Sequence, residues 1–142
     1  MASCGCNLLA RLAIAPLVFE ARGLNVPPTK IDRLKLVGDE EATNALCIVM
    51  SNEITHVSLG KRWFECMCGI DRLNPVSTWH SLVKRYFPGD LEPPFNITAH
   101  NAAHLSAAFY GPLATRDGLV ASSKKGQTPS VDCQHARQGW PR

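Results

Sequence analysis

The amino-acid sequence predicts an all-α fold. Apolar residues recur along most of the chain with the spacing that places them on one face of a helix. No segment alternates apolar and polar residues in the way that marks a half-buried strand. The 142 residues, of which 45% are hydrophobic and 19% charged, suffice for one domain with a modest core. We therefore expect the chain to bury its apolar residues between packed helices.

The first helix is predicted for residues 7–22. Asn7 has a side chain suited to an N-cap, and Gly23 is expected to end the helix. Pro16 lies inside this segment and removes one backbone donor, so a kink or a locally opened turn is expected there.

Two further helices are predicted in the middle of the chain. A short helix, opened by two prolines, is expected for residues 27–37. Gly38 interrupts the pattern, and Asp39 is a suitable N-cap for a long helix that ends at about Cys68.

The C-terminal third is predicted to contain a helix over residues 76–86, started by Pro75, and a last short helix over 97–109. Proline and glycine make the connector between them stiff and non-helical. The expected organisation is an unstructured stretch 1–6, a helical domain 7–109 and a disordered tail 110–142, because the tail is rich in turn-forming residues.

The distribution of charge and the length of the apolar runs argue against two classes of partner, nucleic acids and membranes. Residues 1–111 contain ten Lys/Arg and ten Asp/Glu, whereas residues 112–142 contain five and two. A neutral body argues against a nucleic-acid surface. No apolar run reaches the ~20 residues of a membrane span, and no secretory signal is recognisable. We expect an intracellular, cytoplasmic protein; a mitochondrial presequence stays open, because the first acidic residue is Glu20.

The long predicted helix carries Glu53 and His56 three residues apart on its apolar stripe. On a helical wheel the following residues fall within about 60° of Glu53: Leu46, Val49, His56, Val57, Gly60, Phe64 and Met67. The same test on the first helix groups Glu20 with Leu9, Ala13, Pro16 and Leu17. Both carboxylates are thus expected to point inward.

A buried carboxylate requires a proton, an ion pair or a metal ion. Arg11 and Arg22 project roughly 180° and 200° away from Glu20 on the wheel, so a cation is the more natural partner. A Glu-x-x-His pair on one helix face is the ligand motif of di-iron and di-manganese helical bundles. The sequence therefore predicts Glu20, Glu53 and His56 as metal ligands.

Four stretches also resemble a known family: PLVFEARGLNV (16–26), GDEEA (38–42), NEITHVSLGKRWF (52–64) and RYFPGDLEPPFN (85–96). Over about residues 7–103 the chain resembles the second half of an uncharacterised ferritin-like family related to tRNA-hydroxylase-type ferritin-like proteins. The resemblance implies a partial ferritin-like bundle made of the third and fourth bundle helices plus the C-terminal helices. It assigns Glu20 to the third helix and Glu53 with His56 to the fourth.

The earlier half of that family's pattern is missing, so three of six ligands are found. A homodimer would supply four Glu and two His, and we expect a second copy or another helical chain as partner. The resemblance implies iron, with manganese as the alternative, and an oxidoreductase or hydroxylase if the site is completed. The alternatives are a non-catalytic helical interaction module, a truncated remnant, or a reading frame whose missing helices lie upstream.

Other candidate residues favour plainer interpretations. His100 and His104 imitate a zinc-protease motif, but Asn101 replaces the glutamate base, so we expect half-exposed helix residues. The pairs Cys4/Cys6 and Cys66/Cys68 have too narrow a gap for a structural zinc site and are expected to be free thiols. Core and joint packing is expected for Trp63, Phe64, Trp79, Tyr86 and Phe87.

Overall fold

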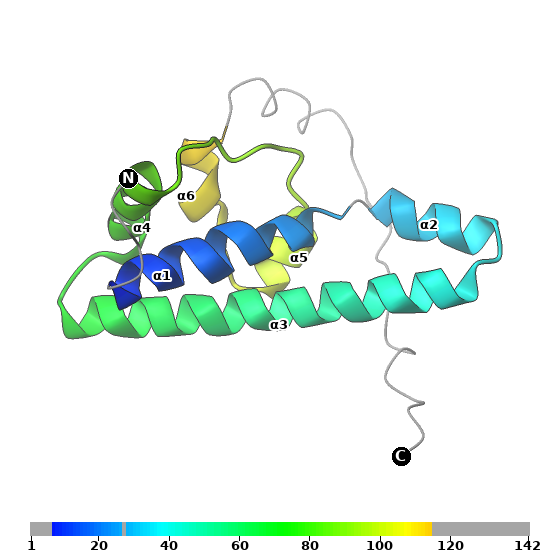
Figure 1. The fold of residues 1–142 in the computed structure, drawn as a ribbon, viewed down its shortest axis with the longest axis horizontal. Coiled ribbons are helices and arrows are strands. Elements are labelled where there is room, and N and C mark those ends of the chain that lie inside the picture. Colours follow the sequence, from blue (N-terminus) through cyan, green and yellow to red (C-terminus); the bar gives the residue numbers. More distant parts are fainter. Residues whose placement is uncertain (1–6, 27, 115–142) are drawn as a thin grey trace, which may run out of the picture.

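The computed structural model describes residues 7–26 and 28–114, and they form an assembly of helices (Figure 1). Within these residues no strand is present, and the only β-type pairing is an isolated bridge between Leu91 and Ala114. The prediction of an all-α fold is therefore confirmed. The segments 1–6 and 115–142 lie outside the described residues, as do the predictions made for them.

The first helical segment changes its winding twice. It comprises α1 (Leu8–Ile14), the π-helical turn η2 (Ala15–Phe19) and the 3-10 helix η3 (Glu20–Asn25). The amide of Ala10 donates to Asn7 Oδ1 at 3.1 Å, which confirms the predicted N-cap. Pro16 has no N–H to donate, and the predicted opened turn is the π turn around it. The prediction that Gly23 ends the helix was wrong, because η3 runs through it to Asn25.

Two helices form the long axis of the molecule. α2 (Pro28–Leu36) turns at Gly38, whose φ is +75°, into α3 (Glu40–Ile70). Asp39 caps α3 by accepting from the Ala42 amide at 2.9 Å. With 31 residues, α3 is about 46 Å long and spans the molecule, so α2 packs along one end and the α1–η3 segment along the rest (Figure 1).

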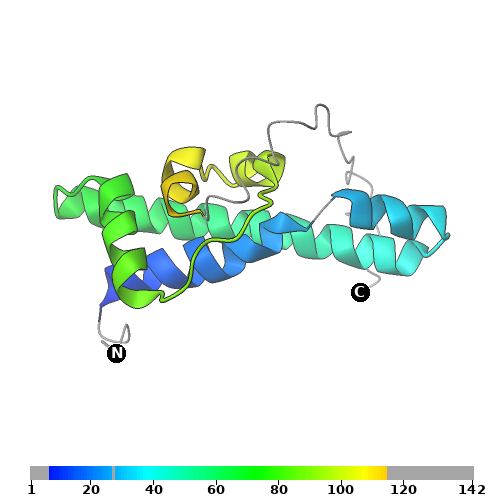
Figure 2. The same cartoon turned by 90° about the horizontal axis from the view of Figure 1, so that it is seen from above.

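The C-terminal elements close over the first helix. α4 (Pro75–Tyr86) is capped by Asn74, whose Oδ1 accepts from the Ser77 amide at 3.0 Å, and α4 crosses the end of the α1–α3 pair (Figures 1 and 2). A non-helical connector follows, with a cis bond between Pro93 and Pro94. It leads to α5 (Ile97–Ala102), α6 (Ala107–Tyr110) and η4 (Gly111–Leu113).

The predicted single helix over residues 97–109 was wrong. α5 ends at Ala102, and His104 adopts a φ of +58°, a left-handed conformation that no α-helix continues through. Order also extends past residue 109, because the Leu91 amide donates to the Leu113 carbonyl at 3.3 Å and thereby joins the connector to η4.

The core lies between α1–η3, the C-terminal half of α3, and α4 to α6. Its largest fully buried side chains are Trp79 and Phe64. Trp79 Nε1 donates to the Ala13 carbonyl at 2.9 Å, which fixes α4 on α1. Trp63, which the sequence placed in the core, is 60% exposed. Adjacent helical side chains point ~100° apart, and Phe64 takes the inward position.

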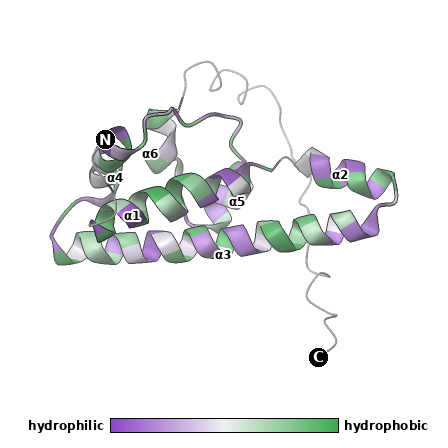
Figure 3. Cartoon of the chain, viewed as in Figure 1, coloured by the Kyte–Doolittle hydropathy of each residue, from purple (hydrophilic) through white to green (hydrophobic). Residues whose placement is uncertain are grey.

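Hydrophobic residues recur along the whole of α3, beyond the part that contacts α1 (Figure 3). None of the helices in the described part of the chain has the length and apolar character of a bilayer-spanning segment.

Candidate metal centre

The structure brings Glu20, Glu53 and His56 together. One carboxylate oxygen from each glutamate and one imidazole nitrogen of His56 all lie within 4.8 Å of one another. Glu20 is the first residue of η3, and the other two lie one helical turn apart on α3. Residues more than 30 positions apart in sequence thus converge at one point between two helices.

The π turn is what aims Glu20 at α3. The Glu20 amide donates to the carbonyls of both Ala15 and Pro16, so the turn before it holds one residue more than an α-helical turn. Such an insertion rotates every later side chain relative to the preceding helix.

Gly60 fixes the close approach of the two helices. A Cβ added at Gly60 would overlap with the ring of Pro16. The π turn therefore rests directly on the backbone of α3, one turn after His56. Any larger residue at position 60 would force the helices apart and move Glu20 away from Glu53 and His56.

Gly23 provides space for the Glu53 side chain. A Cβ at Gly23 would lie 2.9 Å from Cγ and 3.2 Å from Cδ of Glu53. The Glu53 side chain consequently lies across the backbone of η3, close to Glu20.

The cluster lies at the edge of the core rather than inside it. Glu20 and Glu53 are half-buried, and His56 is exposed. The expectation that all three residues point into the interior was therefore too strong. The buried side of α3 includes Thr43, Cys47, Val57, Gly60, Phe64 and Cys68. At 100° per residue its centre is rotated about 50° from Glu53, away from His56.

In the described part of the chain, no arginine forms an ion pair with the two carboxylates. Within residues 7–26 and 28–114, the ion pair present joins Lys61 and Glu65 at 2.6 Å, and it lies outside the cluster. The Arg22 guanidinium lies instead over the Phe87 ring, with Cζ 5.2 Å from its centroid. A bound divalent cation would offset the repulsion between these two neighbouring carboxylates.

The donor set fits a transition-metal ion. Oxygen and imidazole donors bind such ions at about 2.0–2.2 Å, which places neighbouring donors about 3–4 Å apart. The 4.8 Å limit in the cluster therefore requires a movement of about 1 Å, within the reach of half-exposed glutamate rotamers. Three protein donors leave coordination positions open to other ligands.

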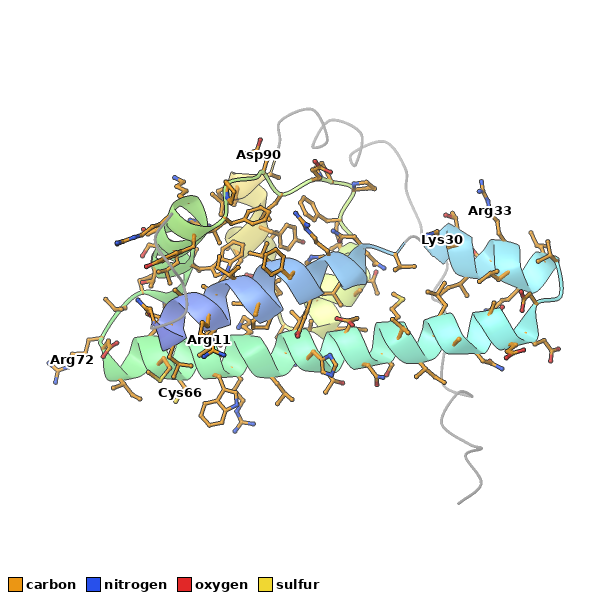
Figure 4. All side chains as sticks on the ribbon, viewed as in Figure 1. Arg11, Lys30, Arg33, Cys66, Arg72 and Asp90 are labelled. Atoms are coloured by element: carbon orange, nitrogen blue, oxygen red, sulfur yellow. The ribbon has the colours of Figure 1, made fainter. Side chains whose placement is uncertain are left out.

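His56 also belongs to an uncovered surface that we call the open face of α3. It consists of Val49, Asn52, His56, Leu59, Trp63, Cys66 and Ile70. The spacing alternates three and four residues, the pattern of a helix seam that packs on another helix. Its large apolar members are 49–69% exposed. Cys66 points away from α1, on a side of α3 where no other described helix lies (Figures 1 and 4).

The other cysteines and histidines singled out in the sequence differ in how exposed they are. Cys66 is an exposed and Cys68 a buried free thiol, while Cys4 and Cys6 lie outside the described residues. His104 is exposed, but the prediction of a half-exposed His100 was wrong, because only 2% of that residue is accessible.

Asn96 explains the burial of His100. Asn96 caps α5, and its carbonyl accepts from His100 Nδ1 at 3.0 Å, one turn into the helix. The signal in the sequence is the Asn-Ile-Thr-Ala-His spacing, which places a histidine one helical turn after an N-cap residue.

Comparisons with known proteins identify relatives of the chain. A family described as "Protein of unknown function (DUF455)" matches residues 2–111. An uncharacterized protein of Haemophilus influenzae is 32% identical over 102 residues, which are 69% of this chain and 35% of that protein. The chain thus spans about a third of the length of this relative. No solved structure matches.

Proposed function

We propose, for a chain that belongs to the DUF455 family, that Glu20, Glu53 and His56 bind a divalent transition-metal ion, iron or manganese. The observation that carries the proposal is the convergence of their three donor atoms within 4.8 Å. The resemblance of the sequence to ferritin-like proteins supports the choice of metal. Iron held by carboxylate and imidazole ligands supplies one-electron and O₂ chemistry, so the activity proposed is that of an oxidoreductase.

A second copy of the chain completes the site in this proposal. One chain offers two carboxylates and one imidazole, half of the donor set of a dinuclear carboxylate centre. His56 lies on the open face of α3, so a helix that packs on this face also covers the cluster and excludes water from it. A two-fold axis would bring an identical set of ligands to the same place.

Manganese titration tests the site without relying on turnover. We expect Mn²⁺, followed by electron paramagnetic resonance and calorimetry, to bind the wild-type chain and to bind Glu53→Gln at least tenfold more weakly, because the amide carries no charge. Glu41→Gln is the matched control, since Glu41 is exposed on the first turn of α3 and distant from the cluster. Equal affinity in all three proteins contradicts the proposed ligands.

Oligomeric mass tests the completed centre. Light scattering combined with elemental analysis, on protein produced in iron-rich medium, should give a dimer with one metal pair for two chains. A metal-free monomer contradicts both the dimer and the metal site. A monomer that holds one ion retains the three ligands and contradicts the second copy.

A second candidate function is a non-catalytic helical interaction module, and the open face of α3 favours it. Its apolar residues are exposed at helix-packing spacing whether or not a metal binds nearby. In this case Glu53→Leu and His56→Ala should leave the fold and the binding of a partner helix intact. Loss of partner binding in Glu53→Leu that depends on added metal would exclude the module.

A further inference from the structure

A cavity of about 410 Å³ lies on the side of η3 that faces the connector, α5 and α6. It is lined by Leu17, Val18, Ala21, Arg22, Asn25, Leu91, Glu92, Phe95, His100, Leu105 and Tyr110. None of the three proposed metal ligands is among these residues. The volume falls in the range of pockets that bind small molecules, and the metal centre plays no part in forming it.

His100 presents an unpartnered nitrogen to this cavity. Its Nδ1 must donate to the Asn96 carbonyl, 3.0 Å away, so Nε2 of the neutral ring is an acceptor. Burial lowers the pKa of His100, which keeps the ring neutral near pH 7. Only 2% of His100 is exposed. Nevertheless, Nε2 has no hydrogen-bond partner among the described residues.

Tyr110 presents a complementary donor. Only 5% of it is exposed, and its hydroxyl has no partner in the part of the chain that the structure describes. Burial raises the pKa of Tyr110, so the hydroxyl keeps its proton. No polar side-chain atom in this part is both inaccessible and unpartnered, so these two atoms keep some accessible surface. Both residues line the cavity.

Three aromatic rings, inclined to one another by 43–80°, line the cavity beside these two residues. The Tyr110 ring centroid lies 4.6 Å from that of Phe95 and 4.6 Å from that of His100. Leu17, Val18 and Leu105 complete an apolar interior. Such a lining favours an aromatic ligand, because aromatic rings attract one another in offset and edge-to-face arrangements.

The cavity lining includes one cation, Arg22, and one carboxylate, Glu92, and no ion pair within residues 7–26 and 28–114 joins them. Arg22 is exposed, forms no ion pair with another described residue, and is held by contact with the Phe87 and Phe19 rings. Ring contact fixes its planar group while leaving N–H donors available for an anion.

We propose that this cavity binds a small aromatic carboxylic acid with a ring hydroxyl. The hydroxyl donates to His100 Nε2 and accepts from the Tyr110 O–H, the ring lies along Phe95 and Tyr110, and the carboxylate meets Arg22. The site is independent of the proposed metal centre, so either can fail without the other.

Three related probes test this arrangement on the full chain. We expect para-hydroxyphenylacetate to bind, and phenylacetate and tyrosol to bind roughly tenfold more weakly, because each lacks one of the two polar groups. Saturation-transfer NMR detects binding, and calorimetry measures the affinities.

Two variants assign the polar contacts. Tyr110→Phe keeps the ring but should weaken para-hydroxyphenylacetate roughly tenfold while leaving phenylacetate unchanged. Arg22→Gln should weaken both acids and leave tyrosol unchanged. Arg11→Gln, an exposed arginine of α1 outside the cavity, is the matched control, and circular dichroism verifies folding.

Two results would overturn the proposal. One is the absence of saturation transfer to every probe in the folded wild-type chain. The other is binding that neither Tyr110→Phe nor Arg22→Gln changes, which would place the probe elsewhere on the protein.

Discussion

The two faces of α3 differ in what covers them. On the packed face, Val57, Phe64 and Cys68 are fully buried against the rest of the chain. On the open face, Leu59 is 49% and Trp63 60% exposed. The residues of the open face nevertheless recur along α3 as regularly as those of the packed face. Regular apolar spacing thus marks a helix face, but it does not say whether other residues of the chain cover that face.

The largest effect should separate the neighbours Phe64 and Trp63. Phe64→Ala should lower the free energy of unfolding by about 3–5 kcal/mol, because it leaves a cavity in the core. Trp63→Ala should change that of the monomer by only about 0.5 kcal/mol. Urea denaturation at low protein concentration measures both. Similar losses would show that the two faces are equally buried.

Two glycines of α3, Gly60 and Gly69, allow a packed and an open position of the same helix to be compared. Gly60→Ala should cost about 1–3 kcal/mol, because its methyl group overlaps with Pro16, and it should weaken Mn²⁺ binding by separating Glu20 from Glu53. Gly69→Ala meets nothing within 4 Å and should stabilise the helix by up to about 1 kcal/mol. Thermal melts and Mn²⁺ titration measure these effects. Unchanged metal affinity in Gly60→Ala would break the link between helix approach and the site.

Association should depend on the open face. If a second copy packs there, Trp63→Ala should raise the dimer dissociation constant roughly thirtyfold, the effect of losing about 2 kcal/mol at a central aromatic residue. Ile97→Ala is the control, because Ile97 is 52% exposed on α5 and outside that face. Sedimentation measures both constants, and equal constants for the two variants would place the interface elsewhere.

The smallest expected effect concerns the cavity. Because burial lowers the pKa of His100 in the fold below 6.5, the unfolded chain binds more protons there as the pH falls through 6.5. The buried neutral ring therefore contributes fully to the free energy of unfolding above pH 6.5. This contribution is lost as the pH falls below 6.5 and through the lowered pKa of the folded state. His100→Asn, whose amide can still donate to Asn96, should show a flatter profile in denaturation across this range. The other ionisable residues that line the cavity are Arg22, Glu92 and Tyr110. They are the same in the wild-type chain and in His100→Asn, so the difference between the two pH profiles reports on His100.

Local signals in the sequence predicted much of the fold. The predicted caps at Asn7 and Asp39 are formed by their own side chains, and each marks a helix start correctly. Such signals depend on a few neighbouring residues, so they survive in any tertiary context. The break in the helix at His104 was not predicted, because no residue type around this position requires a positive φ.

The sequence predicted that Glu20, Glu53 and His56 converge, but it did not predict how exposed they are. The wheel centred the apolar stripe on Glu53, whereas the chain buries the side towards Val57 and leaves His56 outside. The cavity could not be predicted at all. Residues of η3 line it together with Phe95, His100 and Tyr110, which lie about 70–85 positions later in the sequence. The connector that brings these residues together has no hydrophobic periodicity from which its path could be predicted.

The most direct test of the metal site is a crystal grown with Mn²⁺ and measured for anomalous scattering. The account predicts a peak between Glu20, Glu53 and His56, with each side chain contributing a ligand atom at about 2.0–2.2 Å. A map in which the three side chains turn into solvent and no peak lies between them would contradict it.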